Sequence, residues 1–224
     1  MVVCIERAGK IHITRRSRGI HAAWHFWYAV SFGGESELRK VGLSGTHPLT
    51  QRYVLLRKID MEVVEASPDL APILASYAKE CLESGIPKYF GVDQDPEAYL
   101  SGLAERSKAT SELPNGYLPS TTYYCVSGSE ILGAIRIRKG TNANVENVIG
   151  HVGYETRPSA RGKGVASFLL AWVRDHVVTD SVIVTCSIDN PASQKVIENC
   201  GGEYLGNYTS ENEGTVRRYR LART

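Results

Sequence analysis

The sequence predicts a mixed α/β domain with one sheet of about seven strands and four helices. Two observations support this class. From residue 53 onward, segments with strand character alternate with helical segments, and the apolar, β-branched run SVIVTCSI indicates a strand inside a sheet. The 224 residues exceed the usual size of one domain but fall short of two full domains. We therefore expect one domain at 53–224 and an added segment at 1–50.

The first 50 residues differ from the rest in composition. They hold many more basic than acidic residues and show no sustained helical or alternating pattern. An Arg-rich, acid-poor segment fits a targeting extension or a partner-binding arm, although a loosely ordered extension or an incorrectly assigned start is the preferred interpretation. We assign no function to this segment.

Charge and cysteine content exclude several classes of protein. A net charge of +2 argues against a protein that works mainly by coating nucleic acid. The five cysteines are widely spread and form neither a CxxC pair nor a metal-ligand pattern with the six histidines. The longest early apolar stretch, 22–32, is too short to span a bilayer. We expect reduced thiols, no metal, no nucleic-acid or membrane partner, and a cytoplasmic location.

The elements from residue 53 follow in a regular order. Residues 53–66 have strand character, and 67–85 form a helix with Ser67 as its N-cap and Gly85 as its stop. A weaker helix covers about 97–108, and the turn formers of ELPNGYLPS indicate a loop. TTYYCVSG and EILGAIRIRK form a hairpin around a Ser-Gly turn, and the strand VIGHVGYETR follows the polar loop GTNANVEN.

The second half contains the clearest helix. Its mainly apolar side chains recur at helical spacing at Val165, Phe168, Leu169, Trp172, Val173 and His176. SVIVTCSI then indicates a strand covered on both faces. Asn190 caps a short helix that begins at Pro191 and ends before Gly201-Gly202, and GEYLGNYTS with TVRRYRLA closes the sheet as a hairpin.

A basic, glycine-rich loop precedes the clearest helix, in RPSARGKGVASFLLAWV at 157–173. A helix start offers unpaired N–H groups and the positive end of the helix dipole, and glycines let backbone amides approach an anion. Pyrophosphate is the expected ligand. The loop fits neither a P-loop, because Gly164 follows Lys163, nor the dinucleotide fingerprint, whose last glycine is missing. Taken alone, the loop fits an anion site and a solvated turn with a helix cap equally well.

The run GYETRPSARGKGVASFLLAWV resembles the acetyl-CoA signature of the GNAT superfamily of N-acetyltransferases, Gln/Arg-x-x-Gly-x-Gly/Ala, with Arg161, Gly164 and Ala166 in its fixed places. DNPASQKVIENCGG resembles the Asn-led helix after the fifth strand of these enzymes. The resemblance covers about residues 53–224 and implies a GNAT-like acyl-CoA N-acyltransferase fold with acetyl-CoA as co-substrate.

The resemblance also implies which residues hold acetyl-CoA. Loop amides would bind its pyrophosphate, the strand edge before the loop would bind the pantetheine arm, and the Asn-led helix would contact the arm and the phosphates or adenine. The implied residues are Tyr154, Glu155, Thr156, Arg161, Gly162, Lys163, Gly164, Val165, Ala166, Asn190, Ser193 and Lys195. Asn190 is equally well explained as a plain N-cap.

Acetyl transfer to an amine needs a general base, because an amine with a pKa near 10 is protonated at pH 7. His151 and Glu155 are the candidates; four residues apart in a strand, they would point to the same face. A buried core histidine and a solvated or pantetheine-side glutamate are the alternatives. Many relatives place a tyrosine seven residues after the Asn to protonate the leaving thiolate, whereas this chain has Ile197 there, so that role is unassigned.

The sequence therefore predicts an acetyl-CoA-dependent N-acetyltransferase that acts on a primary amine of a small molecule. Protein lysine or N-terminal acetylation, and a non-catalytic acyl-CoA-binding module, are the alternatives. The loop SGIPKYFGVDQDPEAY could receive a cationic amine by charge and ring faces, although a solvated turn with anchoring aromatic rings is the preferred interpretation. Its acidic and aromatic residues are Asp93, Asp95, Glu97, Tyr89, Phe90 and Tyr99. A homodimer is compatible with the sequence.

Overall fold

The structure is a computed structural model. It describes residues 2–6, 10–14 and 60–223, without 112, 115, 116, 212 and 213. The chain divides into two units, Met1–Leu56 and Arg57–Thr224. In the first, β1 (Val2–Glu6) pairs antiparallel with β2 (Lys10–Thr14), two strands that the sequence did not predict. The rest of the predicted segment 1–50 and the start of the predicted strand 53–66 lie outside the described residues.

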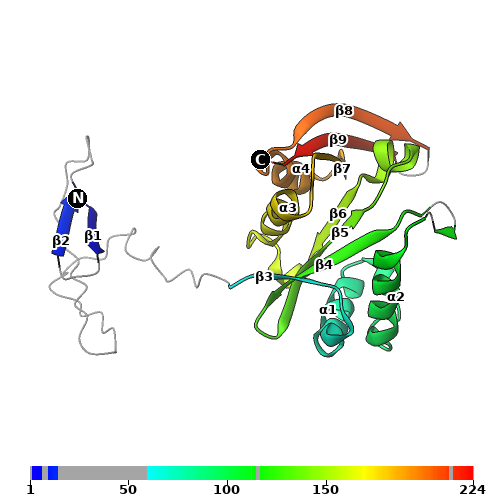
Figure 1. The fold of residues 1–224 in the computed structure, drawn as a ribbon, viewed down its shortest axis with the longest axis horizontal. Coiled ribbons are helices and arrows are strands. Elements are labelled where there is room, and N and C mark those ends of the chain that lie inside the picture. Colours follow the sequence, from blue (N-terminus) through cyan, green and yellow to red (C-terminus); the bar gives the residue numbers. More distant parts are fainter. Residues whose placement is uncertain are drawn as a thin grey trace. The chain divides into compact units, whose positions relative to one another are not determined.

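A seven-stranded mixed sheet organises the second unit, with the strand order β3-β4-β5-β6-β7-β9-β8 (Figure 1). Neighbouring strands are antiparallel except β6 and β7, which are parallel. The strands are β3 (Glu62–Glu65), β4 (Ser120–Ser127), β5 (Glu130–Arg138), β6 (Val152–Thr156), β7 (Ser181–Ser187), β8 (Glu203–Ser210) and β9 (Gly214–Ala222). The predicted mixed α/β class and the seven strands are confirmed.

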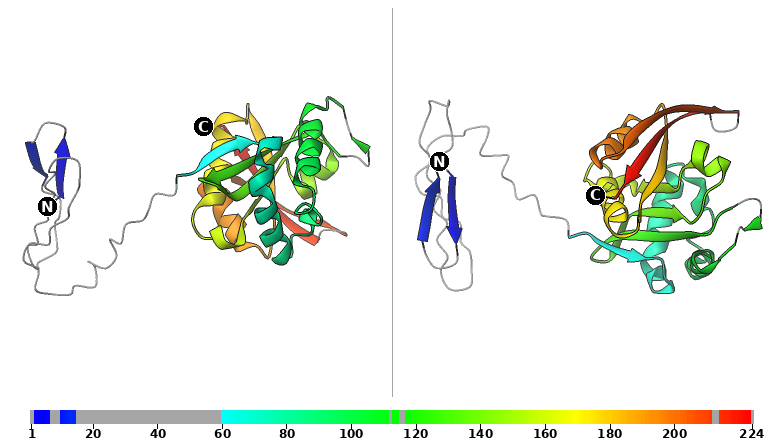
Figure 2. Two further views of the ribbon diagram at one scale, coloured as in Figure 1. Left: turned by 90° about the horizontal axis from the view of Figure 1, so that it is seen from below. Right: turned by 45° about the horizontal axis from the view of Figure 1, so that its top comes forward.

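Helices cover both faces of this sheet. Figures 1 and 2 show α1 (Ala71–Glu83) and α2 (Pro96–Lys108) together on one face and α3 (Val165–His176) and α4 (Pro191–Asn199) on the other. Two separate groups of buried side chains lie beneath them, one containing Leu74 of α1 and the other Leu169 of α3. The sheet therefore presents two different faces, and functional side chains can be assigned to one or the other.

The helix starting near Ser67 begins differently from the prediction. A 3-10 turn, η2 (Pro68–Leu70), comes first, and the Ser67 side chain makes no capping hydrogen bond. Two prolines, Pro68 and Pro72, leave two backbone N–H groups fewer to satisfy at this end, so a side-chain cap is less needed. The predicted stop is confirmed, because Gly85 has a φ of 84° just after α1.

The largest difference lies before β6. A π-helix, η5 (Val145–Ile149), covers the end of the predicted polar loop and the start of the predicted strand, and Gly150 follows it with a φ of 69°. A Cβ atom on Gly150 would lie 3.0 Å from both the Ile183 carbonyl and the Thr185 nitrogen, so only glycine allows the chain to pass so close to β7. The strand therefore starts at Val152, four residues later than predicted.

The cover of β7 is also less complete than predicted. Val184 and Cys186 are buried on the α3 face, but the side chains between them, such as Thr185, are only half-buried. The short η5 covers less of the opposite face than a long helix does. This leaves β7 partly accessible next to β6, where the functional site is expected.

Gly133 allows β5, β6 and α3 to pack closely. A Cβ atom there would lie 2.8 Å from the Glu155 carbonyl and 3.0 Å from Val165 Cγ1. Gly133→Ala is therefore expected to lower the free energy of unfolding by about 1–3 kcal/mol, measured by urea denaturation. Gly102→Ala is the matched control: it has open space around it in α2, and alanine there should raise stability by about 0.5–1 kcal/mol. Equal stability of the two variants would contradict this packing argument.

Candidate active site

The basic loop lies between β6 and α3, as predicted. A 3-10 turn, η6 (Pro158–Ala160), leads into it, and the loop residues Arg161–Gly164 are all exposed. Gly162 and Gly164 have φ values of 75° and 82°, which residues with a side chain rarely adopt. The two glycines therefore determine the path of the loop, and they leave its backbone open to a ligand.

The loop presents a set of backbone donors without internal acceptors. The Arg161 N–H donates to the Pro158 carbonyl (3.2 Å), and the Phe168 N–H donates to the Gly164 carbonyl (2.9 Å). Between them, no described residue accepts a hydrogen bond from the amides of 162–167. These amides lie at the positive end of α3, so they fit a pyrophosphate.

Next to the loop, β6 and β7 separate. Their parallel register consists of one pair, Val152 with Val184, and beyond it the two strands no longer pair. The edges of 153–156 and 185–187 therefore leave backbone polar groups for a ligand that enters between them. The strand edge that the resemblance implies for the pantetheine arm is therefore free of its neighbouring strand.

The Asn-led helix α4 lies on the far side of this gap. The Asn190 side chain accepts a hydrogen bond from the Ser193 N–H (3.0 Å), which makes it the N-cap. The Tyr154 hydroxyl donates to the Ser193 carbonyl (3.3 Å) and so reaches from β6 to α4. Lys195 is exposed, and Ile197 is fully buried in the core rather than in reach of a thioester.

An ion pair that the sequence did not predict holds the start of the loop. Arg157 is buried, and its Nε donates to Glu80 of α1 (2.5 Å), while a second nitrogen donates to the Ser76 hydroxyl (3.1 Å). The other carboxylate oxygen of Glu80 accepts from the Ser159 N–H (2.7 Å). One carboxylate of α1 thus fixes both the end of β6 and the turn before the loop.

Glu80→Gln tests this connection. Burial raises the pKa of Glu80, but the hydrogen bonds from Arg157 and Ser159 outweigh it, so the pKa of Glu80 is lowered. The pKa of Glu80 is thus lower in the folded protein than in the unfolded protein. The ion pair therefore contributes its full stabilisation above the unfolded pKa of about 4.5, and this contribution is lost as the pH falls through the folded value. The variant should lose about 1–3 kcal/mol at pH 7 in urea denaturation, and this loss should shrink as the pH falls through the folded value. A pH-independent difference would contradict the ion pair.

Glu155 of β6 lies on the α1–α2 face, in a narrow hollow. Its side chain is 18% exposed, and one carboxylate oxygen contacts Lys88 Nζ at 2.6 Å. The same oxygen accepts from the hydroxyls of Tyr89 (2.5 Å) and Tyr77 (3.5 Å). Burial and the nearby carboxylate raise the pKa of both tyrosines, which keeps their hydroxyls protonated as donors. An ammonium group therefore already occupies the place next to this carboxylate.

His151 lies apart from Glu155, which differs from the prediction that they share a face. The residue precedes β6, and its Nδ1 accepts the Ile183 N–H (3.0 Å) at the edge of β7. Burial lowers the pKa of His151, so the ring is neutral at pH 7. With Nδ1 as acceptor, the neutral ring carries its proton on Nε2, so its basic lone pair is already engaged. Gly150 causes the difference, because its positive φ turns the chain just before His151.

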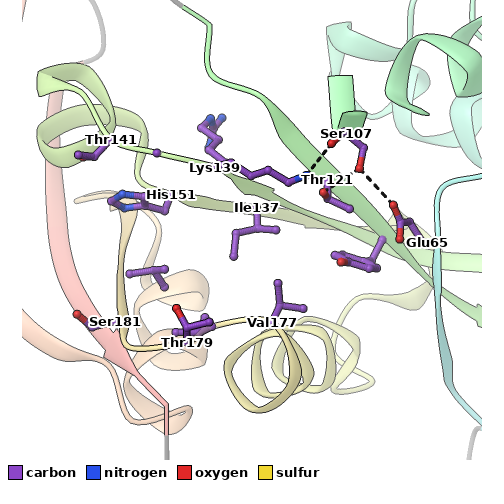
Figure 3. Close-up of a pocket in the computed structure, with 15 residues that line it drawn as sticks. Glu65, Ser107, Thr121, Ile137, Lys139, Thr141, His151, Val177, Thr179 and Ser181 are labelled. Atoms are coloured by element: carbon purple, nitrogen blue, oxygen red, sulfur yellow. Dashed lines mark hydrogen bonds between the residues drawn. The ribbon is translucent and has the colours of Figure 1, made fainter. Parts of the chain in front are cut away.

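A larger pocket, of about 670 Å³, lies around His151 at the start of β6, away from the loop (Figure 3). Ile137 and Val177 form part of its apolar wall, and Lys139 Nζ at its rim donates to the Ser107 carbonyl (2.6 Å). Figure 3 shows His151 beside the Thr141 side of this pocket. The pocket is separated from the Gly-rich loop by the length of β6.

The acidic side chains of the predicted acceptor loop do not line the hollow around Glu155. Asp93, Asp95 and Glu97 are exposed, and Asp95 caps α2 by accepting from the Ala98 N–H (2.9 Å). The aromatic part of that prediction agrees better, because Tyr89 and Tyr99 line the hollow with Glu155. Phe90 is 84% exposed.

Metal-binding groups and membrane-spanning helices were sought in the part of the chain that the structure describes. Within it, no group of His, Cys, Asp and Glu residues could hold a metal ion. No helix among the same residues is long and apolar enough to cross a membrane. Cys81, Cys125, Cys186 and Cys200 are buried free thiols.

Known structures share this fold. Ribosomal L7/L12 alpha-N-protein acetyltransferase RimL, in complex with coenzyme A, is 16% identical with a TM-score of 0.55, covering 72% of this chain and 93% of its own. The microcin C7 self immunity acetyltransferase MccE, with acetyl-CoA and AMP, is 14% identical with a TM-score of 0.55 and coverages of 72% and 92%. Ribosomal-protein-S5-alanine acetyltransferase from Vibrio fischeri is 16% identical, also with a TM-score of 0.55, and coverages of 73% and 93%.

Comparison at the level of sequence identifies the family. No curated protein matches the chain. The family model of the acetyltransferase (GNAT) domain matches residues 64–203, more than half of the chain. This range contains the Gly-rich loop, the separated strands and the Asn-led helix. The chain therefore belongs to the GNAT family of acetyltransferases, acyltransferases that use acetyl-CoA as co-substrate.

Proposed function

We propose that this acetyltransferase acts on a primary amine of a small molecule, with Glu155 as the general base. The contact between Glu155 and Lys88 Nζ carries the proposal, because it places an amine nitrogen 2.6 Å from the carboxylate. An acceptor amine that replaces Lys88 would meet the same oxygen. Glu155 lies on β6 beyond Val152, in the part of the strand that separates from β7.

The size of the hollow supports a small acceptor. In this conformation it has room for about one water molecule, since Lys88 and Tyr89 close it toward α1 and α2. A folded protein surface would need a wide groove at this point. A small amine needs only the movement of Lys88, whose side chain is 39% exposed.

Different residues of the chain have different roles in this proposal. The loop amides of Gly162–Ala166 hold the pyrophosphate, and the free strand edges at Tyr154–Thr156 hold the pantetheine arm. The acceptor nitrogen forms a bond to the acetyl carbonyl carbon while the C–S bond breaks, and Glu155 takes the proton that the nitrogen loses. The departing sulfur then takes up a proton from water, because Ile197 cannot provide one.

The test measures thiol release from acetyl-CoA by the full chain across a panel of small amines, with mass spectrometry of the products. The proposal expects acetylated small amines at rates well above the uncatalysed reaction. Mass spectrometry of proteins incubated with the enzyme and acetyl-CoA tests the alternative acceptors, protein lysines and N-termini. Acetylation of protein lysines or N-termini with no activity on any small amine would overturn the proposal, and so would coenzyme A binding without any acetyl transfer.

A further inference from the structure

Two arginines lie close together on β5, on the α1–α2 face of the sheet. Ala134 packs in the core under α1 and α2, and Arg136 and Arg138, two and four residues further along the strand, point to the same side. Arg136 Nε donates to the Thr122 hydroxyl (3.3 Å), and Arg138 Nη1 donates to the Gly150 carbonyl (3.0 Å). Both guanidinium groups are thus held in place by neutral partners.

Neither arginine has a carboxylate partner among the described residues. The ion pairs among the described residues involve other side chains throughout. Burial and, to a smaller extent, the neighbouring Arg136 lower the pKa of Arg138 to about 10. Holding two half-buried cations together costs electrostatic free energy unless an anion balances them. Such a pair is typical of a site whose counter-charge comes with a ligand.

The pair lies beside the candidate base. In the register of β5 and β6, Arg136 faces Gly153, two residues before Glu155. Gly153 leaves the surface of β6 bare there: a Cβ atom on it would lie 3.8 Å from Arg138 Nη1. Arg136 lines the same hollow as Glu155 and Lys88. One hollow therefore combines a carboxylate that can receive an amine with a guanidinium that can receive an anion.

We infer that the acceptor is a small amine that also carries an anionic group, a carboxylate or a phosphate, which Arg136 binds in the hollow while Arg138 beside it adds positive charge. This inference rests on the proposed function and specifies its substrate class. Guanidinium groups bind these anions through paired hydrogen bonds and so fix the orientation of the acceptor. The anion also offers Lys88 a partner other than Glu155, which frees the carboxylate to take a proton. A purely cationic amine would meet three positive charges and one negative charge here.

The experiment compares acceptors that differ only in this group: glutamate with glutamine, and 2-aminoethyl phosphate with 2-aminoethanol. The anionic member of each pair should have a kcat/KM about 10- to 100-fold higher. Arg136→Gln should remove at least about tenfold of this preference, mainly through the KM of the anionic member. Arg136→Lys keeps the charge without the paired donors, so it should keep part of the preference for the anionic acceptor.

Arg223→Gln is the matched control, because Arg223 is exposed at the end of the chain and should affect neither pair. Thermal unfolding of each variant shows that it is folded. Equal or better acetylation of neutral or cationic amines would overturn the inference while leaving the proposed function intact, whereas no acetylation of any amine would remove the proposed function itself. Short peptides that start with Glu or Gln form a further arm of the experiment. If only the peptides show a preference for the anionic member, the inference of a small-molecule acceptor is overturned.

Discussion

Glu155→Gln is expected to lower kcat for amine acetylation by about 10²- to 10⁴-fold, the usual contribution of a general base. The amide keeps the size of the side chain and can still contact Tyr89, but it cannot take up a proton. Only the neutral fraction of the acceptor then reacts. The residual rate of the variant should therefore rise about tenfold per pH unit until the pH approaches the amine pKa near 10. Steady-state kinetics between pH 6 and 10 measures both effects.

Two further variants separate the base from other roles of Glu155. Glu130→Gln changes an exposed carboxylate in the same sheet and should leave kcat unchanged. His151→Asn removes the other candidate base and should reduce kcat by less than tenfold, because the Nδ1 of His151 already accepts the Ile183 N–H. A large loss in His151→Asn together with full activity in Glu155→Gln would assign the base to His151.

Local sequence signals predicted most of the fold. Helix α3 follows from the apolar spacing after Val165, and the end of α1 from Gly85, because each signal acts within a few residues. The sequence missed η5, because the polar residues around Val145 fit a loop equally well and a π-helix has no distinct pattern. That helix, with the turn at Gly150, shortened β6 and moved His151 off the face predicted for it.

The same distinction explains which site residues could be predicted. The Gly-rich loop and the Asn190 cap are contiguous motifs, and the structure places both where the sequence did. The partners of Glu155 are not contiguous: Tyr89 and Tyr77 lie 66 and 78 residues before it, and Arg157 meets Glu80 across 77 residues. No single-sequence pattern reports such contacts.

One of the missed features did leave a signal. In the strand sequence AIRIR, Arg136 and Arg138 alternate with isoleucines, as expected of a sheet with one apolar face and one face that carries charge. The alternation predicts that both arginines share a face. It does not predict that this face is covered by α1 and α2 or that neither arginine pairs with a carboxylate among the described residues, and these two facts make the pair a candidate anion site.

Gly164→Val is expected to weaken coenzyme A binding by at least about tenfold. A φ of 82° costs a β-branched residue on the order of 1–2 kcal/mol, and the new side chain would lie over the exposed amides at the start of α3. Gly85→Val is the matched control, because Gly85 has a φ of 84° and open space around it but lies at the end of α1. The two variants should lose similar stability, and only Gly164→Val should lose affinity in calorimetry.

Comparison of coenzyme A with pantetheine makes the prediction specific to the pyrophosphate. Pantetheine lacks the phosphates, so its binding depends on the gap between β6 and β7 and not on the loop amides. Wild-type protein should prefer coenzyme A strongly, and Gly164→Val should reduce this preference while binding pantetheine as before. Arg161→Ala should act in the same direction with a smaller effect, since it removes one exposed cation and leaves the backbone donors in place. Equal losses for both ligands would instead mean that the loop supports the fold of the gap and does not bind the pyrophosphate.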